Sequence, residues 1–190
     1  ALPISYEVMN QHVSFLFTSL LTDDCIARGK ALLDGGVRYL GGTNETYGNI
    51  NTSDSLWVIR DLVFNQKKYT LRQLNDAMLA NFNGYEALRK DCLNCDKYGN
   101  DLETADTMAN DLYEFVAKGV RDRGIAIGMQ YFLIVISNNQ LNTEWGNRTA
   151  ASPDGRLSCM YMNPANNPQG GANKSGPTAM LNSLAKFDAK

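Results

Sequence analysis

Gln130-Tyr131-Phe132-Leu133-Ile134-Val135-Ile136 is a continuous run of aromatic and β-branched residues in the last third of the chain. The run lacks the alternation of polar and apolar residues that marks a strand with one face in water. Such a run is typical of a strand buried on both faces, as in a parallel sheet that helices cover. It therefore predicts an α/β fold in which this strand lies inside a helix-covered sheet.

A wholly polar stretch follows this strand. Ligands of helix-covered sheets bind beyond the carboxyl ends of the strands, so the first side chains after Ile136 are candidates for a substrate pocket. These candidates are Ser137, Asn138, Asn139, Gln140 and Asn142. Their neutral donors and acceptors suit hydrogen bonding to a small polar substrate, whereas none of them titrates near pH 7 for proton chemistry. The alternative is a strand that runs into an asparagine-rich turn.

The chain before the strand, residues 1–124, is predicted to be largely helical. Apolar residues recur at helical spacing over residues 4–21, which predicts one amphipathic helix. A second helix follows the cap at Thr22–Asp24 and ends at Gly35-Gly36, and Val37–Leu40 is a candidate for a short strand.

Three more helix signals follow in this part. Ser53 is a candidate cap for a helix that buries Leu56, Ile59 and Val63. Thr70 and Gln73 have the spacing of a capping box, in which each side chain bonds the backbone N–H of the other. The longest helix is predicted over about residues 103–120. The second part, residues 125–190, combines the buried strand with a long irregular segment rich in Asn, Gly and Pro.

Composition excludes several classes of protein. The 190 residues carry 18 Lys and Arg against 20 Asp and Glu, a net charge of −2, which disfavours nucleic acid or anionic lipid as partners. No apolar stretch reaches the ~20 residues of a membrane span. His12 is the single histidine, which leaves little basis for a histidine metal site or a catalytic triad. On a mostly apolar helix it is expected to be a core or boundary residue.

The four cysteines do not suggest a disulfide scaffold in a chain of this size, so the default location is the reducing cytoplasm. Cys92 and Cys95 form a CxxC motif, which can bind a metal or exchange disulfides. A structural zinc needs four ligands, and no second pair follows, so this alternative is weak. Cys25 lies close to acidic residues and is expected to be a structural thiol; Cys159 has no assignment.

Two glycine-containing segments remain. Ala151–Arg156 predicts a turn, because Pro153 fixes φ, Asp154 can bond its own backbone and Gly155 accepts a positive φ. Gly170-Gly171 has the composition to place backbone N–H groups around a phosphate, but it lacks GxGxxG or Walker spacing.

Ten segments in order resemble the glycyl radical enzymes, the pyruvate formate-lyase superfamily, and are closer to its dehydratase and lyase branch. They are Cys25–Lys30, Gly35–Tyr39, Asp54–Leu56, Val63–Phe64, Lys67–Thr70, Asn81–Arg89, Lys97–Asp101, Ala151–Arg156, Lys174–Ala179 and Ser183–Asp188.

The resemblance implies a ten-stranded α/β barrel that encloses two finger loops, one with the cysteine that becomes a thiyl radical and one with the glycine that stores the radical. The chain would be a helix-rich fragment of that barrel with few strands, its two parts (residues 1–124 and 125–190) forming one partial barrel domain. The family is activated by a separate S-adenosylmethionine-dependent radical enzyme and acts on small molecules. The resemblance also implies a homodimer as the full-length enzyme, an anaerobic, cytoplasmic setting and no bound cofactor besides the glycyl radical.

The chain departs from the family at the radical residues. None of its four cysteines follows a glycine in the Gly-Cys-x-Glu form, and no Arg-Val-x-Gly-Tyr-like loop is present, so both radical residues are expected outside this chain. Only scaffold motifs carry over residue by residue: Gly35, Gly36, Arg38 and Tyr39, then Pro153, Asp154 and Gly155. Asn142 stands where the family usually has a histidine, which leaves the substrate open.

Two hypotheses follow. The first is an internal segment of a glycyl radical lyase or dehydratase that cleaves a C–C, C–O or C–N bond by thiyl-radical hydrogen abstraction; the segment alone is expected to be inactive, with no catalytic residue and no metal. The second is a non-catalytic binding or assembly module that keeps the barrel scaffold.

Overall fold

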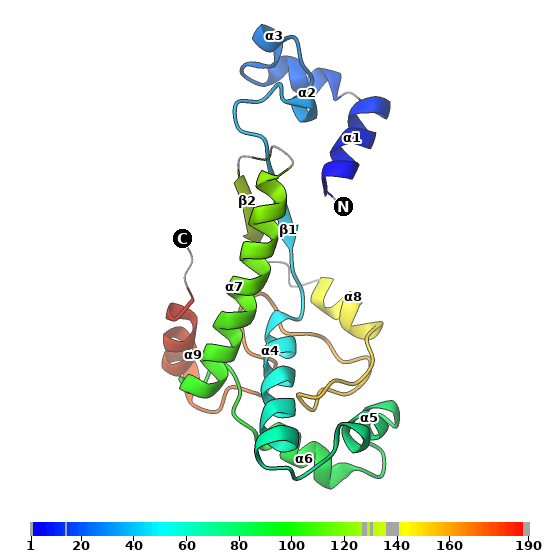
Figure 1. The fold of residues 1–190 in the computed structure, drawn as a ribbon, viewed down its shortest axis with the longest axis vertical. Coiled ribbons are helices and arrows are strands. Elements are labelled where there is room, and N and C mark those ends of the chain that lie inside the picture. Colours follow the sequence, from blue (N-terminus) through cyan, green and yellow to red (C-terminus); the bar gives the residue numbers. More distant parts are fainter. Residues whose placement is uncertain (1, 14, 127–128, 130, 136–140, 188–190) are drawn as a thin grey trace. The chain divides into compact units, whose positions relative to one another are not determined.

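The computed structural model describes the whole chain except residues 1, 14, 127–128, 130, 136–140 and 188–190. It is rich in helices, and its described residues contain two strands, which pair in one sheet. None of the described helices is both long enough and apolar enough to cross a bilayer. The chain divides into two compact units, each discontinuous in sequence (Figure 1).

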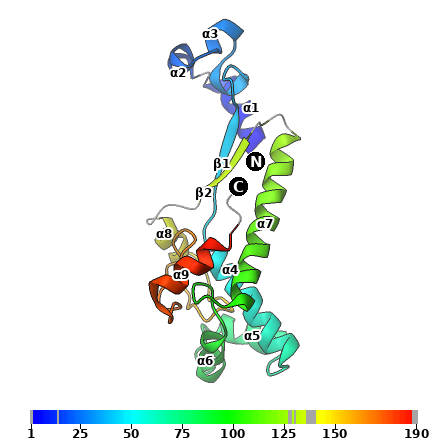
Figure 2. The ribbon, with the colours of Figure 1, turned by 90° about the vertical axis from the view of Figure 1, so that its left-hand side faces the viewer.

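The first unit comprises Ala1–Asn44 and Val116–Val135. It contains the α-helices α1 (Leu2–His12), α2 (Leu16–Leu21) and α3 (Cys25–Arg28), followed by a 3-10 turn at Leu32–Asp34. Strands β1 (Gly41–Glu45) and β2 (Tyr131–Val135) lie side by side, as Figure 2 shows. The predicted strand at the aromatic run is therefore confirmed, and its partner is a glycine-led strand.

Three expectations for this unit were wrong. The helix over residues 4–21 is two helices, because Phe15 adopts a left-handed conformation with φ 43°. The second helix ends at Gly29, well before Gly35. The strand lies at Gly41–Glu45 rather than at 37–40, where the Arg28 guanidinium bonds the carbonyls of Gly35 and Val37 and holds a loop.

The second unit comprises Glu45–Phe115 and Ile136–Lys190. Its α-helices are α4 (Asn49–Val58), α5 (Leu71–Leu79), α6 (Glu86–Asn94), α8 (Leu141–Asn147) and α9 (Gly176–Ala185). A π-helix at Ile59–Asn65 continues α4, and α7 (Glu103–Ile125) begins in this unit. Helices α8 and α9 give regular structure to a segment predicted to be mostly irregular.

Of the two helix caps predicted for this unit, one is present and the other is not. Thr70 and Gln73 form the predicted capping box, with the Gln73 backbone N–H 3.2 Å from Thr70 Oγ1. Ser53 does not cap α4, which begins four residues earlier; its hydroxyl is buried and donates to the Ile50 carbonyl instead. As a result the buried face of this helix carries Val58 rather than the predicted Leu56.

The second unit holds the apolar core of the described residues. One buried cluster joins the π-helix region to α5 and α6, and a smaller one joins α4 to α7 with the ring of Phe187 packed against it. The larger cluster contains Val58, Leu62, Leu74, Ala77, Phe82, Leu88 and Cys92. This core fixes the helices that carry the polar site described next.

Candidate functional site

The turn predicted at residues 151–156 is present and is tightly bonded. The Ser152 N–H donates to the Arg156 carbonyl at 3.0 Å, and the Asp154 carboxylate accepts from the Ser152 hydroxyl at 2.5 Å and from the Arg156 N–H at 3.2 Å. Gly155 has φ 93°, and a Cβ there would lie 2.8 Å from the Leu93 side chain. This position therefore requires glycine for both conformation and space.

Asn51, on the first turn of α4, ties this turn to the rest of the unit. Its side-chain amide donates to Asp154 Oδ2 at 2.6 Å and to Gln169 Oε1 at 3.1 Å. Asn51 and Asn163 also exchange bonds, each backbone N–H donating to the other's side-chain oxygen. The Ser55 hydroxyl accepts from the Asp154 N–H at 3.2 Å. One buried polar network thus holds the start of α4 to the segment that contains Asp154, Asn163 and Gln169, which is distant in sequence.

Arg156 completes the turn from its other side. Its buried guanidinium donates to the carbonyls of Ala150, Leu157 and Met160, and burial lowers its pKa. The Arg89 guanidinium on α6 donates through Nε to the Gly155 carbonyl at 3.0 Å. Two cations therefore lie close to this turn without a carboxylate partner among the described side chains.

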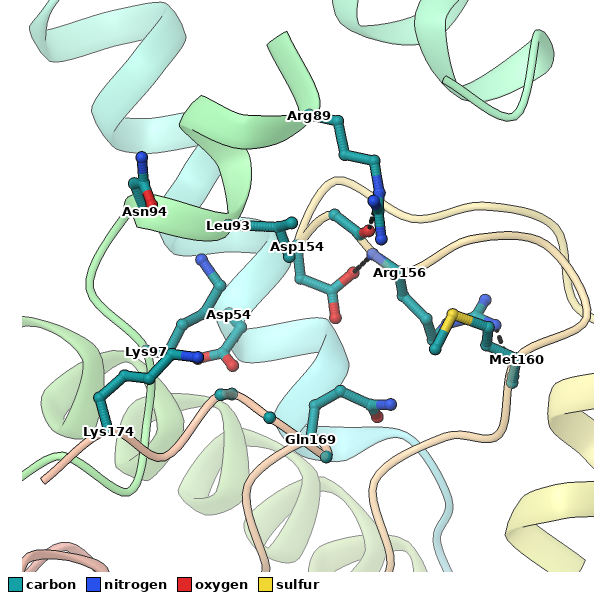
Figure 3. A pocket seen from close by; sticks show the side chains of 14 residues that line it. Asp54, Arg89, Leu93, Asn94, Lys97, Asp154, Arg156, Met160, Gln169 and Lys174 are labelled. Atoms are coloured by element: carbon teal, nitrogen blue, oxygen red, sulfur yellow. Dashed lines mark hydrogen bonds between the residues drawn. The ribbon is translucent and has the colours of Figure 1, made fainter. Parts of the chain in front are cut away.

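A cavity of about 340 Å³ opens beside the turn (Figure 3). Its wall comes from α4, α6, the turn and the segment around Gly170, all within the second unit. Its polar lining consists of Asp54, Arg89, Asn94, Lys97, Asp154, Arg156, Gln169 and Lys174.

Asp54 is the buried acid of this cavity. Burial raises the pKa of its carboxyl group to about 7, although its hydrogen bond from the Tyr98 N–H and the charge of Lys97 oppose that rise. The Tyr98 N–H lies 2.9 Å from Oδ1, whereas Oδ2 is buried with no hydrogen-bond partner among the described residues. This side chain can therefore hold or release a proton near neutral pH.

Lys97 is the buried lysine of the same wall. Its side chain is 5% exposed, and Nζ donates to the carbonyls of Cys92 at 2.5 Å and Cys95 at 3.3 Å. No sequence pattern predicted Asn51, Asp54 or Lys97 as site residues. Asp54 and Lys97 open two of the segments quoted for the family resemblance, which was the available signal.

Of the predicted substrate-pocket residues, Ser137, Asn138, Asn139 and Gln140 lie outside the described residues. Asn142, on the first turn of α8, is buried, and its amide donates to the Met162 carbonyl at 2.9 Å. Its Oδ1 is buried and has no partner within the described chain. Asn142 does not line the 340 Å³ cavity.

The other scaffold motif lies in the first unit. Gly35 has φ 80°, and a Cβ on Gly36 would lie 2.3 Å from the Lys30 carbonyl oxygen. Arg38 pairs with Asp24 at 2.8 Å on the surface, and Tyr39 is exposed. This motif is therefore a tight turn braced by an ion pair.

The cysteines and the histidine show no reactive arrangement. Burial raises the pKa of the Cys92 thiol to about 12 and that of the Cys95 thiol to about 11, so both stay protonated near pH 7. Cys25 is buried against Gly36, as expected of a structural thiol. His12 is exposed at the end of α1, contrary to expectation. Within the described chain no three His, Cys, Asp or Glu side chains are grouped so as to hold a metal ion.

Comparison with known proteins shows which family the chain resembles. The family described as pyruvate formate lyase-like matches residues 1–141. The trans-4-hydroxy-L-proline dehydratase of Clostridioides difficile is 33% identical over 94% of this chain and 23% of its own length. The isethionate sulfite-lyase of Bilophila wadsworthia is 32% identical over 90% of this chain and 20% of its own length.

Structures agree with these sequence matches. The crystal structure of hydroxyproline dehydratase from Clostridioides difficile, with trans-4-hydroxy-L-proline bound, superposes with a TM-score of 0.89 and 31% identity over 97% of this chain and 23% of that protein. The chain thus spans about a quarter of the length of the relatives it matches. It belongs to the pyruvate formate lyase-like family, the superfamily of the glycyl radical enzymes.

Proposed function

We propose that the chain is a segment of a glycyl radical lyase or dehydratase that cleaves a C–C, C–O or C–N bond of a small substrate. The observation that carries this proposal is the continuity of the match: sequence and structure both align with a dehydratase over at least 94% of the chain. The bonds broken by the relatives differ, since one releases sulfite and another is a decarboxylase, so the substrate class follows from the family only in outline.

In this proposal β1 and β2 are strands of the family's α/β barrel, and the helices of the second unit are part of its cover. The networks around Asn51 and Arg156 support this role, because they hold the loop residues 150–169 in place against α4. The radical cysteine and glycine have no counterparts in this sequence by motif. The chain's contribution is therefore structural, together with part of the pocket wall.

The pocket wall is proposed to be the polar stretch after β2, comprising Ser137, Asn138, Asn139, Gln140 and Asn142. The buried, unpartnered Oδ1 of Asn142 supports this assignment, because a buried amide oxygen without a partner is costly unless a ligand or water supplies one. Its neutral amide would accept a hydrogen bond from a substrate hydroxyl or amine.

The test is anaerobic activation of the full-length protein that contains this segment. Incubated with its S-adenosylmethionine-dependent activating enzyme, it should develop the doublet EPR signal of a glycyl radical. It should then convert one of a panel of trans-4-hydroxy-L-proline, glycerol, 1,2-propanediol, isethionate and 4-hydroxyphenylacetate. A glycyl radical formed on the 190-residue chain alone would contradict the proposal, as would a full-length protein that forms no radical.

The role of Asn142 has its own test in the activated enzyme. Asn142→Ala should raise KM for the converted substrate by roughly tenfold, the worth of one buried hydrogen bond. Asn147→Ala, an exposed residue on the same helix, is the matched control and should leave KM unchanged. Equal effects of the two substitutions would argue against substrate contact at Asn142.

A further inference from the structure

The cavity beside the turn has an excess of positive charge in its wall. Four cationic side chains line it, and the two acids among its lining residues are Asp54 and Asp154. Both oxygens of Asp154 already accept hydrogen bonds within the protein. The charge of the cations is therefore not matched by the protein's own acids inside this wall. The cations are Arg89, Lys97, Arg156 and Lys174.

Lys97 is the clearest case. Its two hydrogen bonds to carbonyls leave one N–H of the ammonium group unused, and no carboxylate of the described residues lies within 4 Å of Nζ. The charge of Lys97 acts on Asp54 without direct contact, and a buried ammonium that no carboxylate contacts is costly. A ligand that brings a negative charge into the cavity would remove that cost.

Asp54 supplies the second independent observation. Asp54 lines the same cavity, and its Oδ2 is buried and has no hydrogen-bond partner among the described residues. The groups that face this carboxyl from the neighbouring elements are Lys97, Asp106, Asp154 and the Tyr98 N–H. Burial is the main cause of the raised pKa of this carboxyl group and the two neighbouring acids add to it, so the protonated form of Asp54 is favoured there, and its O–H is then a donor rather than an acceptor.

Another part of the cavity wall is formed by the Gly170-Gly171 pair. A Cβ on Gly170 would lie 1.8 Å from the hydroxyl oxygen of Tyr161, so a larger residue at that position would require this exposed tyrosine side chain to move. Backbone N–H groups at glycine pairs are common donors to oxyanions. The Gly170-Gly171 pair thus lines the cavity with backbone alone.

We propose that this cavity binds one small oxyanion, held by the ammonium groups of Lys97 and Lys174 and by the Asp54 carboxyl group as donor, with the Arg89 guanidinium as a further positive charge in the same wall. A neutral ligand or a water molecule would satisfy the Asp54 oxygen but would leave Lys97 uncompensated. A cation is disfavoured by the four positive side chains. The proposal does not depend on the radical chemistry proposed above.

Binding should take up a proton. The pKa of the Asp54 carboxyl group is about 7, and only its protonated form donates to the oxyanion. Affinity should therefore fall as the pH rises from 6 to 8.5. Sulfate is the suitable probe, because its charge stays constant over this range, unlike that of phosphate.

The experiment is calorimetric titration of the 190-residue chain with sulfate at constant ionic strength set by chloride. Wild type should bind one sulfate per chain, roughly thirtyfold more weakly at pH 8.5 than at pH 6. Asp54→Asn keeps a neutral donor and should bind with little change between the two pH values. Lys174→Ala, at an exposed residue whose removal should not affect folding, should weaken binding roughly tenfold.

Lys90→Met is the matched control, because Lys90 is exposed on the same helix as Arg89 and lies outside the cavity lining. It should leave sulfate affinity unchanged. Lys97→Met should abolish binding if the variant remains folded by circular dichroism. The proposal is overturned if wild type binds no sulfate saturably, if its affinity is independent of pH, or if Lys90→Met and Lys174→Ala weaken binding equally. Acetate and phosphate titrations then show which oxyanion class the cavity prefers.

Discussion

The two units differ in whether their helices enclose a continuous apolar core. In the second unit, Leu74 and its neighbours are 0–4% exposed and form a continuous core. In the first unit the apolar face of α1 and α2 is open, with Ile4 66%, Phe17 76% and Leu21 72% exposed. Both patterns have helical spacing in the sequence. The difference teaches that periodicity identifies the face of a helix that needs cover, but not whether the same segment of chain supplies that cover.

A pair of leucine substitutions, one in each unit, tests this difference in burial most directly. Leu74→Ala should lower the free energy of unfolding of the second unit by about 2–5 kcal/mol, because it removes a fully buried side chain and leaves a cavity. Leu21→Ala should change stability by less than about 0.5 kcal/mol, because its side chain is already in solvent.

The two units can be followed separately. Both tryptophans, Trp57 and Trp145, belong to the second unit, so urea unfolding monitored by tryptophan fluorescence reports that unit. Amide hydrogen exchange of peptides from α1 and α2 reports the first. A Leu21→Ala loss as large as that of Leu74→Ala would show that another part of the protein covers α2.

The second prediction concerns the buried carboxyl group of Asp54 in the second unit and its effect on stability. The carboxyl pKa of Asp54 is raised by burial to about 7, above the value of ~3.9 for an unfolded chain. The folded state then binds more protons between these values, so stability should fall as the pH rises from about 4 to about 7 and then level off. The loss should amount to about 2–4 kcal/mol.

Asp54→Asn should remove that dependence while keeping the acceptor for the Tyr98 N–H. Urea unfolding at pH 5 and pH 8 in chloride buffer, free of oxyanions, measures the difference for wild type and variant. The surface acid Asp76 is the control: Asp76→Asn should retain the wild-type slope. Stability that rises with pH in this window would mean that Asp54 is ionised in the folded protein.

The sequence predicted those parts of the fold whose causes are local. The capping box at Thr70 and Gln73 needs only its own turn, and the β-branched run at Tyr131–Val135 favours a strand wherever it is placed. Strand β1 was misplaced because Gly41 and Gly42 have low strand propensity, so its pairing with β2 depends on tertiary contacts. The break at Phe15 has no signal in residue type, since φ is positive at an aromatic residue there.

The site was less predictable than the fold. The turn at Pro153–Gly155 could be predicted from its own residues. Its partner Asn51 lies 103 residues away, and no residue near Asn51 predicts that this side chain bonds several segments. Asp54 and Lys97 begin two of the segments quoted for the family resemblance, but no local pattern predicts that they are buried. Both side chains become buried only when α4 packs against the segment after α6. No spacing of residues in a single sequence predicts that contact.

The third prediction compares two buried polar residues, one in each unit. Asn51→Ala should destabilise the second unit by about 2–3 kcal/mol, because Asp154 and the Asn163 N–H lose buried partners together. Ser19→Ala in the first unit should cost about 1 kcal/mol, since its hydroxyl bridges only the Leu32 N–H and the Phe15 carbonyl. Fluorescence-monitored unfolding and hydrogen exchange measure the two units as above. Equal losses would show that Asn51 is not the hub of the network.

The smallest expected effect concerns ion pairs. Lys186 lies 2.8 Å from the buried Asp106 carboxylate and 3.0 Å from Asp101, whereas Arg38 pairs with Asp24 on the surface. Lys186→Met should cost about 1–2 kcal/mol, below the value for a fully buried pair because Lys186 is one-third exposed. Arg38→Met should leave the exchange of the first unit unchanged within error.

The pH dependence separates these pairs further. The pKa of Asp101 is lowered by its hydrogen bonds from Asn182 and Lys186, so its contribution is present above the unfolded value of ~3.9 and is lost as the pH falls through the lower folded value. The pKa of Lys186 is raised, chiefly by Asp106, so its contribution is complete below ~10.4 and is lost only at higher pH. The difference between wild type and Lys186→Met should therefore be constant from about pH 5 to 9 and shrink below pH 4. A difference that grows on acidification would mean that Lys186 is not paired with these carboxylates in the folded protein.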